Sequence, residues 1–199
     1  MELLIATTHS GKFREIRLAL SDLSVNCLSL NDFPKHPVVA EDGWTFEENA
    51  LKKARTIGRW SGKMTLADDS GIVVPALGGR PGIHSARYSG PGSTDQENLQ
   101  KLIGEVRGLP DSERGAFYVC VLVVVLPTGE EWTFTGRCDG VLLAEPRGMG
   151  GFGYDPVFFL PALGKTLAEI PLTEKNTLSH RGKALRELKN KLRMTLPKK

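Results

Sequence analysis

Two adjacent carboxylates, Asp68 and Asp69, end a short apolar run and are followed by Ser70 and Gly71. Carboxylate oxygens suit a hard divalent cation such as Mg²⁺, which usually keeps part of its water shell. A stretch rich in Gly, Arg, Tyr and Ser follows at 78–90. Glycine lets backbone amides approach an anion closely. Together these residue types indicate phosphate chemistry.

The same four residues, 68–71, are also turn formers, so a simple turn is the competing interpretation. If a strand instead runs through them, Asp68 and Asp69 point to opposite faces, and only one of them faces a shared site. The sequence alone does not decide which carboxylate that is.

A second glycine-rich stretch, at 148–153, matches the pattern G-x-G-x-x-G. A dinucleotide site requires a helix directly after that pattern. Here the following residues, 154–159, have strand character and an early proline. The better interpretation is a flexible loop that lies against a ligand and ends in Tyr154 and Asp155.

Four basic residues have ordinary explanations when taken alone. Lys12 lies in no P-loop pattern and would usually be a surface residue. Lys175 lies in a charged segment, 173–176, predicted to be a solvent-exposed turn. His180 and Arg181 open a predicted helix, where the helix dipole disfavours positive charge, which hints at a ligand.

The elements that must position these residues follow a mixed order. Strands are expected at 3–6, 25–30, 64–68, 72–74, 117–126, 131–143 and 155–160, with a break at Ser70 and Gly71. Helices are expected at 13–20, 45–58, from 94 or 95 to 106, and at 180–192. Turns and loops are expected at 7–12, 31–43 and 78–92. Thr45 and Glu48 resemble a capping box. Early βα units, a central hairpin and a last helix predict an α/β fold with a mixed sheet.

The bulk composition is that of an ordinary globular protein. The chain has 199 residues, of which 40% are hydrophobic and 25% charged; this fits one α/β unit or two closely fused lobes. The net charge of +3 gives no strong case for a polyanionic partner. From Arg181 to Lys199, eight Lys or Arg residues face one acid, Glu187, which predicts a solvated helix face. A nucleic-acid-binding module using this helix is the alternative class, and its affinity would fall steeply with salt.

The cysteines and the first residues of the chain indicate the cellular compartment of the protein. Cys27, Cys120 and Cys138 are widely spaced and form no C-x-x-C pair, so buried free thiols in a reducing interior are expected. The first residues lack a basic region followed by a long apolar one, and no apolar run reaches 18 residues. These features predict a cytoplasmic protein without a membrane partner.

Five motifs occur in a fixed order at 46–50, 67–71, 81–90, 150–156 and 179–182. In order and spacing the chain resembles the inosine triphosphate pyrophosphatase family, the non-standard purine nucleoside triphosphate pyrophosphatases, over essentially its whole length. The resemblance implies one pyrophosphatase domain, 1–199, in which a long mixed sheet divides two α/β lobes with the active site in the cleft between them.

The resemblance also implies a function. Members of that family are cytoplasmic, Mg²⁺-dependent homodimers that hydrolyse ITP, dITP and XTP to the monophosphate and pyrophosphate, and so remove deaminated purines from the nucleotide pool. No nucleic acid or membrane is a partner. The nearest alternative is a pyrophosphatase of similar fold that acts on other modified nucleotides, such as modified pyrimidines.

Carried over by motif, Asp69 would be the general base and a metal ligand, Glu41 a metal ligand, and Asp68 a second ligand or a support for the turn. The triphosphate would be bound by Thr7, Thr8, His9, Ser10, Gly11, Lys12, Lys53 and Ser70. The base would be bound by Phe152, Gly153, Tyr154, Asp155, Lys175, His180 and Arg181. Donors at the edge of the base would select a 6-oxo purine against adenine, which presents an amino group there.

One residue departs from the family pattern. His9 stands where the family commonly has Asn, two residues after the first Thr of this loop. An imidazole can still donate a hydrogen bond to a phosphate, and it gains charge at low pH. The affinity or the pH dependence is therefore expected to differ from that of relatives, whereas the reaction class is not.

Overall fold

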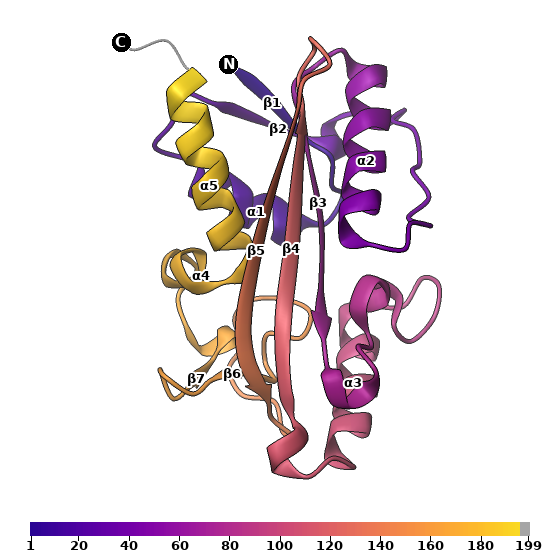
Figure 1. Ribbon diagram of the computed structural model, residues 1–199, viewed down its shortest axis with the longest axis vertical. Coiled ribbons are helices and arrows are strands. Elements are labelled where there is room, and N and C mark those ends of the chain that lie inside the picture. The colour runs from indigo at the N-terminus through magenta and orange to yellow at the C-terminus, as the bar shows by residue number, and fades with distance from the viewer. Residues whose placement is uncertain (196–199) are drawn as a thin grey trace. The chain divides into compact units, whose positions relative to one another are not determined.

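The structure is a computed structural model that describes residues 1–195 (Figure 1). Seven strands form one mixed sheet in the order β2-β1-β3-β4-β5-β6-β7. They are β1 (Glu2–Ile5), β2 (Asn26–Ser29), β3 (Thr65–Val73), β4 (Gly115–Val125), β5 (Glu131–Leu142), β6 (Phe158–Leu160) and β7 (Lys165–Thr166). β1 pairs in parallel with β2 and β3, whereas β6 pairs antiparallel with β5 and β7. The predicted mixed α/β sheet is confirmed.

The helices are α1 (Ser10–Ala19), α2 (Phe46–Ser61), α3 (Asp95–Arg107), α4 (Leu172–Leu178) and α5 (His180–Thr195). The chain forms two compact units. The first contains Met1–Asp69, Cys120–Gly136 and the described part of the segment that begins at His180. The second contains Ser70–Val119 and Arg137–Ser179. The long strands β3, β4 and β5 contribute residues to both.

The core of the first unit lies between the sheet and the helices α1 and α5. Its fully buried side chains include Leu3, Ile5, Ile16, Leu66, Cys120, Leu122, Leu185 and Leu188. α5 and α2 lie on opposite sides of the strands (Figure 1), so both faces of this part of the sheet are covered. Covered strands read as nearly continuous apolar runs, as residues 3–6 and 120–126 do.

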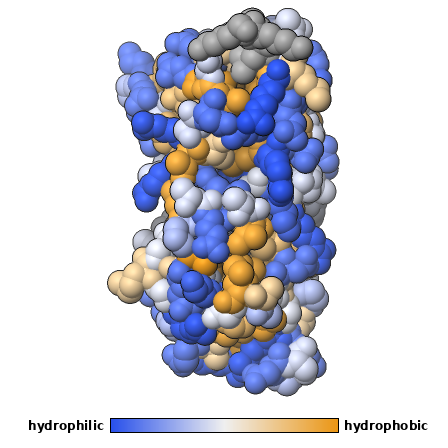
Figure 2. Space-filling model, turned by 90° about the vertical axis from the view of Figure 1, so that its left-hand side faces the viewer, coloured by the Kyte–Doolittle hydropathy of each residue, from blue (hydrophilic) through white to orange (hydrophobic). Residues whose placement is uncertain are grey.

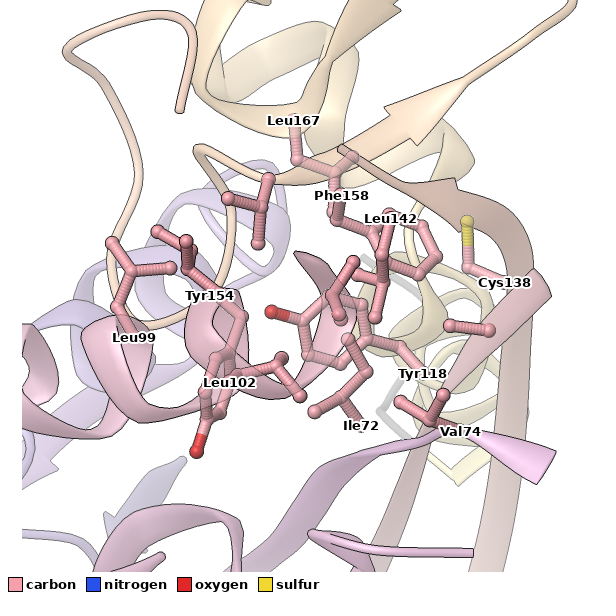
Figure 3. Packing of buried hydrophobic residues seen from close by; sticks show 14 of the residues in the cluster. Ile72, Val74, Leu99, Leu102, Tyr118, Cys138, Leu142, Tyr154, Phe158 and Leu167 are labelled. Atoms are coloured by element: carbon pink, nitrogen blue, oxygen red, sulfur yellow. The ribbon is translucent and has the colours of Figure 1, made fainter. Parts of the chain in front are cut away.

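The second unit has a separate hydrophobic core (Figure 3). It gathers Ile72, Val74, Leu99, Leu102, Tyr118, Cys138, Leu142, Tyr154, Phe158 and Leu167. α3 supplies the apolar side chains spaced three and four residues apart that the sequence predicts, since Leu99, Leu102, Ile103 and Val106 are all buried. Thr94 and Glu97 form a complete capping box at its start.

Local signals explain the start and end of α2. The hydroxyl of Thr45 accepts from the amide of Glu48 at 3.1 Å. The carboxylate of Glu48 accepts from the amide of Trp44 rather than from that of Thr45, so the predicted capping box is only half formed. Gly62 ends the helix in the left-handed conformation, with φ +65°, which glycine adopts without a steric penalty.

Several expected boundaries are wrong. β3 runs unbroken from Thr65 to Val73, so the residues 68–71 form neither a turn nor a strand break. The expected turn at 7–12 is shorter, because α1 already begins at Ser10. The segment 173–176 lies in the helix α4. The strand expected at 155–160 is confined to 158–160, and short 3-10 helices occur at 75–77 and 82–87.

The predicted hairpin is confirmed, since β4 and β5 are neighbours in the sheet and the amide of Leu126 donates to Glu130 across the turn. On the face shown in Figure 2, hydrophilic residues predominate and smaller hydrophobic patches lie between them.

Among residues 1–195, no helix is both long and apolar enough to cross a membrane. Among the described residues the three cysteines are free; Cys120 and Cys138 are buried, whereas Cys27, which was expected to be buried, is only half-buried.

Candidate active site

The segment between β1 and α1 is organised by His9, which caps the helix. Its Nδ1 accepts hydrogen bonds from the amides of Gly11, at 3.1 Å, and Lys12, at 3.3 Å. Its own amide donates to the hydroxyl of Thr7 at 3.2 Å. A ring nitrogen that accepts carries no proton, so His9 does here what an Asn side-chain oxygen does at an N-cap.

Because β3 is unbroken, the side chains of Asp68 and Asp69 lie on opposite faces of this strand. Successive side chains of a strand point to opposite faces. Asp68 therefore contacts side chains of α1 and α5, whereas Asp69 contacts Lys53 of α2. The prediction that they would face opposite sides if the strand persisted is confirmed.

Asp68 is fully buried among donors. Lys12 Nζ lies 2.6 Å from its Oδ1, and Arg181 Nε donates to its Oδ2 at 2.7 Å. The thiol of Cys120 donates to the same Oδ2 at 3.2 Å. Burial by itself would raise the pKa of Asp68, but Arg181 and Lys12 hold that pKa well below its usual range. Burial and the neighbouring carboxylate raise the pKa of Cys120 well above its ordinary value.

Lys53 binds the other carboxylate and a third acid. Its Nζ donates to Asp69 Oδ1 at 3.0 Å, to Glu41 Oε1 at 2.8 Å and to the backbone oxygen of Asp68 at 2.8 Å. Burial works to lower the pKa of Lys53, but the carboxylates of Asp69 and Glu41 reverse that effect and raise it. Three oxygens thus surround one ammonium, which shows that this place attracts a cation.

Asp69 retains an unused acceptor. Its Oδ2 is buried and has no hydrogen-bond partner among residues 1–195. Burial raises the pKa of Asp69, and the opposing effect of Lys53 and Lys12 is smaller. A buried carboxylate oxygen without a donor is costly unless a ligand supplies one. The atom is therefore suited to a metal ion or a water molecule.

A cavity of about 330 Å³ adjoins these groups within the first unit. Its lining residues include Thr7, Thr8, Lys12, Glu41, Lys53 and Asp68, together with Leu30, Ile57 and the loop 36–39. The two ammonium groups and two hydroxyls in this lining suit phosphate oxygens, and the carboxylates suit a cation that accompanies them.

In the second unit a buried ion pair lies beside an aromatic ring. Lys175 Nζ donates to Asp155 Oδ2, and only 2% of the Lys175 side chain is exposed. The ammonium also lies 4.7 Å from the centre of the Phe152 ring, within cation–π range. The expectation that Lys175 is solvent-exposed is wrong, because α4 places it beside a buried carboxylate.

Hydrogen bonds and close packing hold the loop that carries Asp155 in place. Asp155 Oδ2 accepts from the amide of Phe152 at 2.9 Å, and Tyr154 donates its hydroxyl to the backbone oxygen of Ser85 at 2.7 Å. Burial raises the pKa of Tyr154, which keeps this hydroxyl protonated. Gly151 has φ +71°, and a Cβ there would lie 2.1 Å from Asp155 Oδ2, so no larger residue fits.

Comparison with known proteins decides the family. The model of the Ham1 family matches residues 3–191. The chain belongs to the Ham1 family. It is 52% identical over 190 residues to a protein of Geobacter sulfurreducens named dITP/XTP pyrophosphatase, a match that covers 96% of each chain. A protein of the same name from Geobacillus kaustophilus is 49% identical over 187 residues, covering 94% of this chain and 92% of the relative.

Solved structures of Ham1 proteins share the fold. The HAM1 protein of Coxiella burnetii matches with a TM-score of 0.86 and 38% identity, covering 98% of this chain and 99% of its own. The Staphylococcus aureus Ham1 protein matches with a TM-score of 0.85 and 35% identity, covering 98% of this chain and 100% of its own. The family resemblance seen in the motifs and the predicted fold class are both confirmed.

The predicted site residues of this Ham1 chain fall into two groups. Those in the first unit are Thr7, Thr8, His9, Ser10, Gly11, Lys12, Glu41, Lys53, Asp68, Asp69, His180 and Arg181. Those in the second unit are Ser70, Phe152, Gly153, Tyr154, Asp155 and Lys175. Side-chain contacts join Lys12, Asp68 and Arg181, and separately Lys53, Glu41 and Asp69. The residues predicted to bind the base are therefore divided, with His180 and Arg181 in the first unit.

Sequence reasoning missed three polar residues of these clusters. Glu15 of α1 pairs with Arg181, Cys120 binds Asp68, and Asp95 accepts from the amide of Gly153 at 3.2 Å. Glu15 carried one weak signal, because it lies three residues after Lys12 on the same helix. Nothing local marks Cys120 or Asp95. The basic run of the C-terminus is only partly a solvated face, since Arg181 is buried; its last members, Lys198 and Lys199, lie outside the described residues.

Proposed function

We propose that this chain is a Mg²⁺-dependent nucleoside triphosphate pyrophosphatase that hydrolyses ITP, dITP and XTP to the monophosphate and pyrophosphate. Curated relatives named dITP/XTP pyrophosphatase, identical at about half of the positions over nearly the whole chain, support the substrate class. The observation in the structure that carries the proposal is Asp69, whose buried carboxylate has one oxygen on Lys53 and the other without a donor among the described residues.

The first unit would bind the phosphates. Lys12 and Lys53 line the cavity and supply fixed positive charge, and the hydroxyls of Thr7 and Thr8 supply further donors. The family resemblance also assigns His9, Ser10 and Gly11 of this unit, and Ser70 of the second unit, to the triphosphate. Oxygens of a triphosphate would take over part of the contacts that Lys12 and Lys53 make with carboxylates.

The residues present fit a Mg²⁺ ion held mainly by Asp69 and Glu41. Both carboxylates already converge on the ammonium of Lys53. In the described chain no group of three or more His, Cys, Asp or Glu side chains could hold a metal. Mg²⁺ suits such a site, because it usually takes one or two carboxylates and completes its shell with water and phosphate oxygens. When bound, the ion would polarise the phosphates and lower the pKa of a water molecule.

Asp69 would accept the proton of the attacking water. Its raised pKa brings a carboxylate closer to the range in which a general base works at neutral pH. Asp68 is assigned a supporting role, because its two oxygens are bound by Lys12, Arg181 and Cys120 on the other face of β3.

The second unit would recognise the base. Lys175 offers a donor for a 6-oxo group, and the Phe152 ring offers a surface for stacking. The amides of Phe152 and Gly153 donate to Asp155 and Asp95 and so hold the loop that carries the ring. Tyr154 and Asp155 hold this loop in place. His180 and Arg181 remain assigned to the base by the family resemblance, and the guanidinium of Arg181 is also held by Asp68 and Glu15.

Pyrophosphate release across a nucleotide panel tests the proposal. The purified chain should release pyrophosphate from ITP, dITP and XTP with Mg²⁺ and much more slowly from ATP and GTP. EDTA should stop the release and excess Mg²⁺ should restore it. Asp69→Asn is the matched control for a contaminating enzyme. No release from any of the three substrates would overturn the proposal, and release from a modified pyrimidine nucleotide alone would support the alternative substrate class.

We further propose that the active form is a cytoplasmic homodimer and that residues 1–199 act as one pyrophosphatase domain. A dimer is supported by the family resemblance, and a reducing location by three cysteines without a disulfide. Light scattering coupled to size-exclusion chromatography tests the first point, since a particle of one chain's mass, 21.7 kDa, would contradict it.

A further inference from the structure

We propose that Asn49 is a positioning residue for the proposed Mg²⁺ site. Its side-chain amide holds the backbone of Gly43 against α2 and so keeps Glu41, two residues earlier, beside Asp69. The proposal rests on the pyrophosphatase function proposed for this chain. Asn49 belongs to the motif at 46–50, but neither the sequence patterns nor the family resemblance gave it a role.

The contact between Asn49 and Gly43 is short and involves a buried side chain. Asn49 is the fourth residue of α2, and its exposed fraction is 0%. Its Oδ1 accepts a hydrogen bond from the amide of Gly43 at 2.8 Å. A Cβ at position 43 would lie 2.8 Å from the same Oδ1 and 2.8 Å from Glu48 Cβ, so this close approach requires glycine.

Asn49 and Lys53 hold the segment of Glu41 at two points. They are four residues apart on α2 and therefore lie on one face of the helix. Lys53 Nζ lies 2.8 Å from the carboxylate of Glu41 and 3.0 Å from that of Asp69. Asn49 holds the backbone two residues after Glu41. The carboxylate of Glu41 and the backbone beside it are thus both fixed to the same helix face.

The hydrogen bond to Asn49 does not compete with a metal ion. The carboxylates of Glu41 and Asp69 that bind Lys53 are also those proposed to bind Mg²⁺, so the ion and this ammonium draw on the same negative charge. The bond from the Gly43 amide to Asn49 uses no carboxylate oxygen. It can therefore keep Glu41 near Asp69 whether or not an ion is bound.

Two other contacts between this segment and α2 lie in solvent. Lys52 Nζ lies 2.6 Å from Asp42 Oδ1, but these side chains are 42% and 70% exposed. The amide of Trp44 donates to the carboxylate of Glu48 at an exposed position. Exposed contacts of this kind contribute little, because water and salt screen them. The contact with the buried amide of Asn49 is therefore the strongest of the three.

The nitrogen of the same side chain supports a role beyond packing. The Gly43 amide needs an acceptor, so the oxygen of the Asn49 side chain must face it, which settles the orientation of the amide group. Nδ2 is buried and has no hydrogen-bond partner among residues 1–195. An unsatisfied buried donor is destabilising, so stability alone would favour an apolar side chain of this size. The segment that Asn49 positions accounts for the amide.

Titration with Mn²⁺ tests the proposal without turnover. Mn²⁺ prefers the same oxygen ligands as Mg²⁺, and the free ion is followed by electron paramagnetic resonance. Asn49→Leu removes the acceptor at nearly constant volume and should raise the Mn²⁺ dissociation constant about 10-fold. Gly43→Ala should raise it by a similar factor, since the added Cβ pushes the segment away from Asn49. In the double variant the two effects should not add, because both changes break one contact.

Lys52→Met is the matched control, because it breaks the exposed pair with Asp42, the residue next to Glu41. It should change the dissociation constant less than about twofold. Unchanged Mn²⁺ affinity in folded Asn49→Leu, an equal loss in Lys52→Met, or wild-type protein that binds no Mn²⁺ would overturn the proposal. If Asn49→Leu does not fold, Gly43→Ala carries the test, and wild-type affinity in that variant would contradict the proposal.

Kinetics with ITP separate positioning from a general loss of structure. In Asn49→Leu the Mg²⁺ concentration that gives half the maximal rate should rise about 10-fold, while saturating Mg²⁺ restores kcat. A loss of kcat at every Mg²⁺ concentration without that shift would overturn the positioning role alone. Wild-type protein that releases no pyrophosphate from ITP, dITP or XTP would overturn the proposed function, whatever the Mn²⁺ titrations show.

Discussion

The two units hold polar clusters of different composition. In the first unit, three cations, Lys12, Lys53 and Arg181, meet four carboxylates, Glu15, Glu41, Asp68 and Asp69. In the second unit, Lys175 and Asp155 form a buried ion pair beside an aromatic ring. The first cluster, here called the carboxylate cluster, carries an excess of negative charge, whereas the second, here called the Lys175 pair, is neutral.

The difference indicates what each cluster can bind. A surplus carboxylate in a buried site is stabilised by an added cation, so the carboxylate cluster suits a metal ion and the phosphates that accompany it. A neutral, sealed pair beside an aromatic ring gains nothing from a further ion. It can instead orient donors and a flat surface toward an uncharged ring. The four predictions below address this comparison, and the one with the largest expected effect comes first.

Asp69→Asn should lower kcat roughly 10²–10⁴-fold with ITP while nucleotide binding is largely retained, because the amide cannot accept the proton of water. Pyrophosphate release gives the rate, and calorimetric titration with ITP gives the affinity. A variant that keeps its activity would move the role of the base to Asp68 or elsewhere. It would also remove the functional distinction between the two faces of β3.

Lys175→Met should lower the free energy of unfolding by about 3–5 kcal/mol, because the buried carboxylate of Asp155 loses its ammonium partner. Adding Asp155→Asn should recover much of the loss. The matched control is Arg55→Met, which breaks the exposed pair with Glu131 and should cost at most about 1 kcal/mol. Urea unfolding measures all of them. Equal losses in Lys175→Met and Arg55→Met would show that the Lys175 pair is no more sealed than a surface pair.

His9→Ala should lower the free energy of unfolding by about 1 kcal/mol, whereas His9→Asn should leave it nearly unchanged. The reason is that both His and Asn present an acceptor to the amides of Gly11 and Lys12, and Ala does not. Thermal unfolding at one pH measures the difference. If His9→Asn were as destabilising as His9→Ala, the ring would have a role beyond capping.

The thiol of Cys120 should react with a disulfide reagent at pH 8 much more slowly than that of Cys27. Only the thiolate reacts, and burial together with Asp68 raises the pKa of Cys120, so at any given pH its thiolate fraction is smaller than in a free cysteine. Burial also raises the pKa of Cys27, but that residue is only half-buried. Mass spectrometry of labelled peptides follows both. Equal rates would show that the carboxylate cluster opens readily to solvent.

Much of the fold could be predicted from local sequence. The apolar runs at 3–6 and 117–126 became strands, the spacing of Leu99, Leu102, Ile103 and Val106 became the buried face of α3, and Thr94 became its cap. The error at residues 68–71 has a clear physical cause. The residues 68–71 are turn formers in isolation, but neighbouring strands provide hydrogen bonds that keep β3 extended through them.

The candidate site was predicted by the order of its motifs more than by local chemistry. Local reasoning placed Lys175 on the surface and read Lys12 as an unremarkable cation. Both side chains pair with residues that are distant in the sequence. Asp155 lies 20 residues from Lys175, and Asp68 lies 56 residues from Lys12. Burial of a charge depends on such partners, so it could not be predicted residue by residue.

By itself the sequence determined most strands and helices, the cap at Thr94 and the family, because these depend on neighbours within a few residues or on motif order. Only the tertiary structure decided which carboxylate faces which helix, and that Arg181 binds Asp68, 113 residues away, and Glu15, 166 residues away. The physical reason is that a buried charge is stable only where an opposite charge meets it, and folding alone brings such distant groups together.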